Sequence, residues 1–178
     1  MDMELAQAGG AARVIEVPER LPEPRHRLDP RAKQLWRLGS AIGGLITTGI
    51  VAMGAFGLQR LAEFEMRWAW AAVGATLVLV ILNAWLSPEL RYRFWRYDIR
   101  PDEADLQHGW FTRTRQLVPM ARIQHVDTRS GPLDRRFGLA SVVLYTAAGA
   151  ALIPALAVDD AAEARDRIAT LANIHDDL

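Results

Sequence analysis

The chain has 178 residues, of which 51% are hydrophobic and 24% are charged, and its 21 Lys and Arg are balanced by 21 Asp and Glu. This length allows one ordinary domain, or a small domain joined to a second element. A formal net charge of zero removes the electrostatic argument for a nucleic-acid partner, and the lack of cysteine excludes disulfide scaffolds, thiolate metal sites and cysteine nucleophiles.

The first segment, residues 1–37, is mostly polar and predicts a flexible N-terminal tether on the cytoplasmic side. Its prolines lie among charges between residues 18 and 30, a composition typical of an extended linker. For residues 14–17, a short strand or a docking peptide is the alternative to a linker. A cleaved signal peptide fits poorly, because too many polar residues precede the first apolar run.

Two apolar runs, residues 38–58 and 68–86, predict a transmembrane helical hairpin over residues 38–87. Neither run contains a charge, and at about 1.5 Å per residue each can cross the ~30 Å hydrocarbon core of a bilayer. The alternative, two core helices of a soluble bundle, would require charges on a solvent face. Ser87 and Pro88 predict the end of the second helix. Tryptophans at the ends of the runs predict anchors at the membrane interface: Trp36, Trp68, Trp70 and Trp85.

Charges beside the runs predict their orientation. Arg and Lys are frequent before the first run and after the second, whereas the connection between the runs has only Arg60 and Arg67. By the positive-inside rule both termini are cytoplasmic. Attraction of the N-terminal cations to anionic lipid is a second explanation for part of this cluster.

Small residues recur every four positions in the first run, which permits close packing of helices. These small residues fall into two sets, and we expect both sets to pack the first helix against the second. We also expect Asn83 to form an interhelical hydrogen bond. No ionisable residue lies inside either run, which argues against an ion path within this chain. The two sets are Gly39, Gly43 and Thr47, and Ser40, Gly44 and Thr48.

Residues 91–178 predict a small cytoplasmic α+β domain. Five to seven short strands, spaced by turn residues between residues 91 and 157, favour an antiparallel β-barrel or sandwich. Residues 159–174 then have the apolar periodicity of one amphipathic helix that caps it. The apolar face of this helix holds Ala161, Ala164, Ile168, Leu171 and Ala172.

Short motifs between residues 118 and 149 carry a family resemblance. They comprise Pro119, the triplet Arg122, Ile123 and Gln124, then Gly131, the turn Arg136, Phe137, Gly138 and Leu139, and the turn from Thr146 to Gly149. Together with the two apolar runs, they resemble the YdbS-like bacterial pleckstrin-homology (PH) membrane proteins over about residues 38–174.

This resemblance implies a PH-like fold behind two transmembrane helices, with seven strands in two orthogonal sheets and a C-terminal helix. It also implies the bacterial cytoplasmic (inner) membrane and suggests a partner membrane protein with related domains. A role in membrane stress or antimicrobial-peptide resistance is suggested too. The resemblance brings no catalytic residues.

The physical interpretation of these motifs is mainly structural. Gly138 and Gly149 suit turns with positive φ. The apolar positions of the region are expected in the core: Ile123, Phe137, Leu139, Val142 and Leu144.

Arginines form the candidate binding surface. Arg113 and Arg115, two residues apart on one expected strand, should project to the same side. Guanidinium groups suit phosphate oxygens, so these arginines could bind anionic lipid or a partner. A solvated face is the alternative. The candidates are Arg113, Arg115, Arg129, Arg135 and Arg136.

We find no catalytic motif and expect no enzyme, cofactor or metal. The four histidines are dispersed, and a site from His108, His125 and Asp127 is conceivable, although surface histidines are the favoured interpretation. The first functional hypothesis is therefore a membrane-anchored, non-enzymatic adaptor or scaffold whose domain docks a second membrane protein. An anionic-phospholipid-binding module and an accessory subunit of a transport or export complex are the alternatives. The lipid bilayer is an expected partner in each case, a homo-oligomer stays open, and no nucleic acid is expected.

Overall fold

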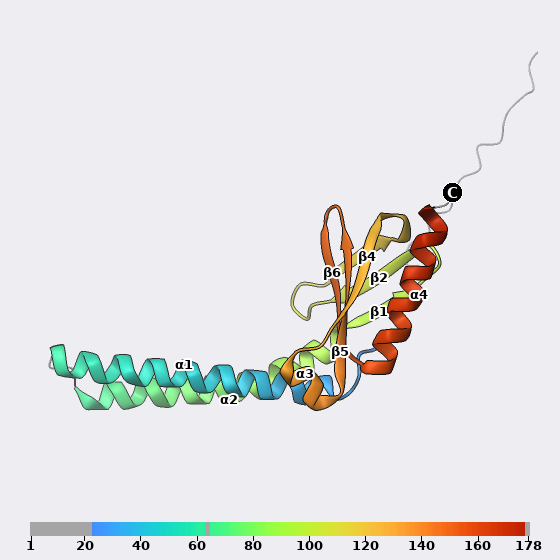
Figure 1. Cartoon of the computed structure of the whole chain (residues 1–178). Coiled ribbons are helices and arrows are strands. Elements are labelled where there is room, and N and C mark those ends of the chain that lie inside the picture. Colours follow the sequence, from blue (N-terminus) through green and yellow to red (C-terminus); the bar gives the residue numbers. More distant parts are fainter. Residues whose placement is uncertain (1–22, 63–64, 177–178) are drawn as a thin grey trace, which may run out of the picture.

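The computed structural model describes residues 23–62 and 65–176. A long helical hairpin carries, at one end, a domain made of two sheets and three helical segments (Figure 1). The predicted α+β class, a two-helix hairpin followed by a PH-like domain, is confirmed.

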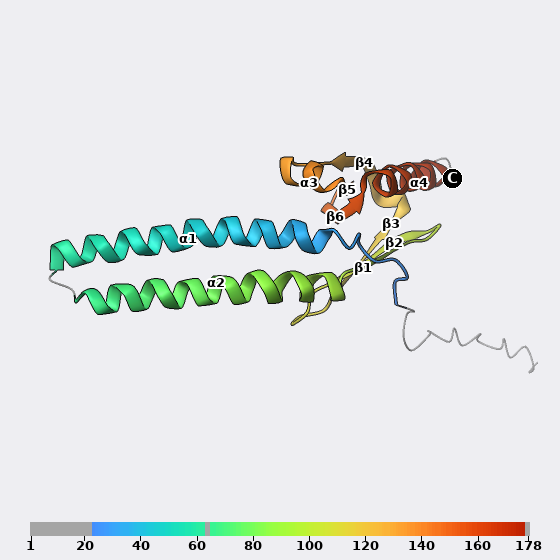
Figure 2. The ribbon, with the colours of Figure 1, turned by 90° about the horizontal axis from the view of Figure 1, so that it is seen from below.

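The hairpin consists of α1 (Ala32–Ala62) and α2 (Met66–Phe94), which pack side by side along their length (Figure 2). Both helices are long and apolar enough to cross a membrane. Their apolar side chains point outward: Leu45 is 76% exposed and Leu79 is 66% exposed. A core helix of a soluble protein would bury this surface, whereas a bilayer covers it.

The helices extend beyond the predicted limits of 38–58 and 68–86, and Pro88 does not end the second helix. Pro88 lies buried inside α2, which continues to Phe94, so residues 91–94 are helical where a strand was expected. Proline removes one backbone hydrogen bond but has a helical φ. The last turns of α2 are held by α1, for example through the Glu89 carboxylate, which lies 2.9 Å from Lys33 Nζ.

Residues 23–31 are an ordered part of the domain, and the prediction of a flexible tether is wrong for them. Leu28 is 2% exposed, and His26 exchanges two backbone hydrogen bonds of 3.0 Å with Tyr97. The backbone N–H of Asp29 donates to the Ala155 carbonyl at 3.2 Å. An extended, proline-rich segment with one apolar anchor suits such edge pairing. Residues 32–37 of the predicted tether belong to α1, and its residues 1–22, including 14–17, lie outside the described residues.

The domain contains two antiparallel three-stranded sheets. The first has the order β1 (Arg96–Ile99), β2 (Glu103–His108), β3 (Thr114–Pro119), and the second has β4 (Ile123–Arg129), β5 (Leu139–Thr146), β6 (Gly149–Ala157). The described residues thus form six strands, where the resemblance implied seven. Three helical segments complete the domain: η1 (Met120–Arg122) between the sheets, α3 (Pro132–Phe137) between β4 and β5, and α4 (Val158–Asp176) at the end.

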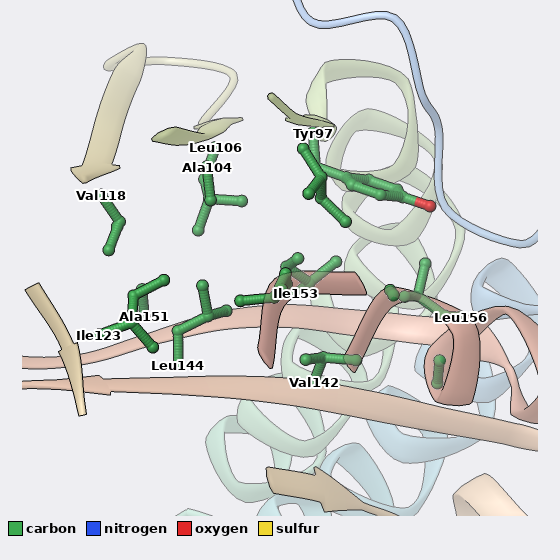
Figure 3. Packing of buried hydrophobic residues seen from close by; sticks show 14 of the residues in the cluster. Tyr97, Ala104, Leu106, Val118, Ile123, Val142, Leu144, Ala151, Ile153 and Leu156 are labelled. Carbon is green, nitrogen blue, oxygen red and sulfur yellow. The ribbon is translucent and has the colours of Figure 1, made fainter. Parts of the chain in front are cut away.

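The core lies between the two sheets. Leu106 and Val118 of the first sheet face Leu144 and Ile153 of the second (Figure 3). The predicted core positions Ile123, Leu139, Val142 and Leu144 are buried, whereas Phe137 is only partly buried beside the start of α1. On α4, the predicted face is confirmed, with Ala161, Ala164, Ile168 and Ala172 buried and Leu171 partly buried.

Candidate functional site

Cations and aromatic rings join the two helices at the end of the hairpin that carries the domain, which we call the domain end. The Arg91 guanidinium lies 4.2 Å from the Trp36 ring centre, and the Arg37 guanidinium lies 5.3 Å from that of Trp85. Lys33 Nζ lies 4.6 Å from the Tyr92 ring centre. Such pairs combine an apolar body with a charged head, as membrane interfaces favour.

The other two predicted anchors, Trp68 and Trp70, lie at the opposite end of the hairpin. They are 57% and 67% exposed, and the Arg67 guanidinium lies 5.7 Å from the Trp68 ring centre. The four tryptophans thus mark both ends of the apolar helices, and their anchoring role stays a prediction.

Only one of the two small-residue sets packs the helices together. A Cβ atom built on Gly44 would lie 2.1 Å from Val80 Cγ1 of α2. Built on Gly39 or Gly43, it would meet nothing within 4 Å. Gly39 and Gly43 therefore make no close packing contact with α2, contrary to expectation. Asn83, for which an interhelical hydrogen bond was expected, is exposed on α2.

Arg115 belongs to a buried ionic cluster in the first sheet. Asp98 and Asp105 stand opposite each other on β1 and β2, and Asp105 is fully buried. Arg115 donates two hydrogen bonds to Asp105, from Nε at 2.9 Å and from Nη2 at 2.6 Å, and Arg100 Nη2 adds a third at 3.2 Å. The Asp105 carboxylate raises the pKa of the Arg115 guanidinium. Arg115 thus neutralises the buried Asp105 carboxylate, while Arg100 also lies 3.4 Å from the facing Asp98.

Arg113 lies outside β3 and does not share the surroundings of Arg115. This differs from the prediction, which placed both residues on one side of the same strand. Its guanidinium lies 5.7 Å from the ring centre of Phe94, the last residue of α2. Arg113 is therefore held at the domain end of the hairpin.

The other three candidate arginines belong to the second sheet and its connection. Arg129 stacks on Tyr145 at 5.6 Å and also donates to its hydroxyl group. Arg135 Nη1 donates to the Ser130 carbonyl at 3.2 Å, while Arg136 is exposed on α3. In Figure 2, α3 lies on the α1 side of the helix pair, whereas the loop that connects β2 and β3 lies on the α2 side. The structure therefore does not gather the five arginines into one patch.

Several of the family-motif residues form turns. Gly138 ends α3 with φ 66° and Gly149 has φ 134°, as predicted. Thr146 Oγ1 donates to the Gly149 carbonyl at 2.9 Å, and the Gly131 N–H donates to Asp134 Oδ2 at 2.8 Å. Pro119 ends β3, and Arg122 and Gln124 are exposed on either side of buried Ile123.

The conceivable metal site of His108, His125 and Asp127 is not formed. His108 stacks on Trp95 at 5.9 Å in the first sheet, and His125 stacks on Tyr145 at 4.2 Å in the second. Within residues 23–62 and 65–176, no group of three metal-ligating side chains comes together.

Two features of the domain end were missed by the sequence analysis. Residues of α1, α2 and α3 line an open cleft of about 590 Å³, among them Trp36, Ser40, Arg91 and Leu133. The connection between β2 and β3 presents Trp110 and Phe111, which are 58% and 87% exposed. Two adjacent aromatic residues beside a turn glycine were the signal that could have revealed the second feature.

Comparisons with known proteins agree with this architecture. The model of the family described as "Bacterial PH domain" matches residues 48–172. The UPF0699 transmembrane protein YdbS of Bacillus subtilis (strain 168) is 35% identical over 159 residues, which cover 87% of this chain and 97% of that protein. No solved structure gave a significant match.

Proposed function

The chain belongs to the bacterial PH domain family of membrane proteins, and from this premise we propose that it is a membrane-anchored adaptor without catalytic activity of its own. In this proposal, the chain docks a second membrane protein. The domain lies on the cytoplasmic side of a bacterial inner membrane, with both termini on that side.

The distribution of cations supports this orientation. Lys33, Arg37, Arg91 and Arg93 lie at the domain end of the helices. The opposite end has Arg60 and Arg67, one of which is paired with Glu65. Positive charge is enriched on the cytoplasmic side of membrane proteins, which supports the proposal that the domain end lies on that side.

The observation that carries the docking proposal is the unused small-residue face of α1. Gly39 and Gly43 lie one turn apart and have no neighbour within 4 Å of a Cβ position, whereas Gly44 is filled by Val80. The Thr47 hydroxyl donates to the Gly43 carbonyl at 2.9 Å, so this face exposes no unsatisfied hydroxyl to lipid. Small residues allow another helix to approach closely and gain van der Waals contact within a membrane.

Affinity purification of the full chain from native membranes in mild detergent, followed by mass spectrometry, tests the proposal. We expect a stoichiometric second membrane protein with the wild type and a strong loss of it with Gly43→Leu. Gly74→Leu is the matched control, because Gly74 is also open but lies on α2. A protein that purifies alone, or equal recovery of the partner with both variants, would count against docking on this face.

A second candidate function, binding of anionic phospholipid, is favoured by α3. This helix contacts α1 at the domain end and exposes Arg135 and Arg136 beside the membrane-spanning segment. Guanidinium groups there could bind lipid phosphates. Native mass spectrometry of the full chain from phosphatidylglycerol-containing nanodiscs measures this. The double variant Arg135→Ala/Arg136→Ala should retain fewer bound anionic lipids, and unchanged retention would refute the idea.

A further inference from the structure

The connection between β2 and β3, residues 109–113, exposes two adjacent aromatic rings, and we call it the aromatic tip. The exposed fractions are 58% for Trp110 and 87% for Phe111. The two rings contact each other edge to face, with centres 5.8 Å apart. Large apolar groups exposed side by side on a domain indicate an interaction surface.

The aromatic tip has a defined conformation. Gly109 has φ 95°, and a Cβ atom there would lie 2.0 Å from the Thr112 carbonyl oxygen, so the turn requires glycine. The pairing of β2 with β3 extends up to His108 and Thr114 immediately beside it. The strands therefore hold the two rings outward in advance of any contact, which lowers the entropic cost of binding.

The position of the aromatic tip relates it to the membrane. Figures 1 and 2 both show the β2–β3 connection beside the domain end of α2, turned back toward the hairpin. A contact of Arg113 agrees with this placement, because its guanidinium lies 5.7 Å from the ring of Phe94 at the end of α2. The paired side chains Arg91 and Trp36 mark the interface on the same stretch of the hairpin.

We propose that the aromatic tip inserts into the interfacial layer of the bilayer and is a third membrane contact of the protein, beside α1 and α2. Trp and Phe rings favour this layer, and Arg113 places a cation next to them at the level of lipid phosphates. We assign the bilayer as the binding partner of the aromatic tip, because α2 spans the bilayer and holds the aromatic tip next to its surface. Insertion therefore proceeds at high effective concentration. This contact would fix the orientation of the domain relative to the membrane, independently of any docking through α1.

The chain has no cysteine, so a single spin label can be placed without background. Phe111→Cys and, separately, Trp110→Cys would be labelled in the full chain and reconstituted without other proteins into vesicles of phosphatidylcholine and phosphatidylglycerol. Ala148→Cys is the matched control, because Ala148 lies exposed at a different hairpin tip, between β5 and β6. Collision of each label with oxygen, which concentrates in lipid, is compared with collision with a water-soluble nickel complex.

We expect high oxygen access and low nickel access at residues 110 and 111, and the reverse at residue 148. Nickel access at both tip positions equal to that at residue 148 would overturn the proposal. Shielding that appears only at high protein density, or only after another membrane protein is added, would also overturn it. Those outcomes would assign the aromatic tip to a second copy or to a protein partner.

Discussion

Gly44→Ala should force the two helices of the hairpin apart. The added Cβ would lie 2.1 Å from Val80 Cγ1 and 3.1 Å from both Val80 Cβ and Cγ2. Nonbonded carbon atoms prefer about 3.5–4.0 Å, so the shortest contact is too close by at least about 1.4 Å. The Val80 side chain cannot easily rotate away, because β-branched residues have one strongly preferred rotamer in a helix.

The expected magnitude combines two opposing effects. Overpacking a tight contact costs about 1–3 kcal/mol, while alanine in place of glycine favours a helix by up to about 1 kcal/mol. Gly43→Ala is the matched control, since it has the same helix propensity gain but meets nothing within 4 Å. The difference between the two variants isolates the steric cost, for which we expect about 1–3 kcal/mol.

Reversible unfolding of the full chain in mixed detergent micelles measures this difference. Spin labels on α1 and α2 would report the helix separation in the same samples. The double variant Gly44→Ala/Val80→Ala removes both Val80 Cγ atoms and should recover much of the lost stability. Equal stability of Gly44→Ala and Gly43→Ala, within about 0.5 kcal/mol, would refute this reasoning, as this is the usual scatter of neutral substitutions.

Three further predictions concern the domain. Arg115→Ala should lower the free energy of unfolding by about 3–5 kcal/mol in chemical denaturation, because it leaves the buried Asp105 carboxylate short of a partner, and Arg115→Lys should lower it less. Gly138→Ala should cost about 1–2 kcal/mol in the same assay, since φ is 66° there and the new Cβ would lie 3.1 Å from Arg31 Nη1. The hydrogen-bonded Arg31 guanidinium holds the pKa of Asp29 below its ordinary value of 3.8. Asp29 therefore contributes stability that is complete above that value and is lost as the pH falls through the lowered pKa. Stability measured against pH in Arg31→Ala should show a smaller loss, because the Arg31 backbone N–H still donates to Asp29.

The sequence alone determined the features that depend on local pattern. Two charge-free runs predict a hairpin because length and polarity are sufficient to identify a bilayer-spanning helix. The α4 helix was predicted because its apolar residues recur with helical periodicity. Gly138 and Gly149 were predicted as turn residues because only glycine adopts a positive φ at little cost. The family resemblance followed from short motifs of this kind.

Only the tertiary structure decided which surfaces meet. Gly43 and Gly44 are equivalent in local pattern, yet only Gly44 packs on α2, because a rotation of about 100° between neighbouring residues sends them to different sides. Pro88 stays helical because α1 holds the last turns of α2. Arg115 was expected at the surface, but its guanidinium pairs with the buried Asp105 carboxylate of the neighbouring strand β2. Strand pairing and helix packing bring such partner residues together from different elements. A local sequence pattern contains no information about which elements become neighbours.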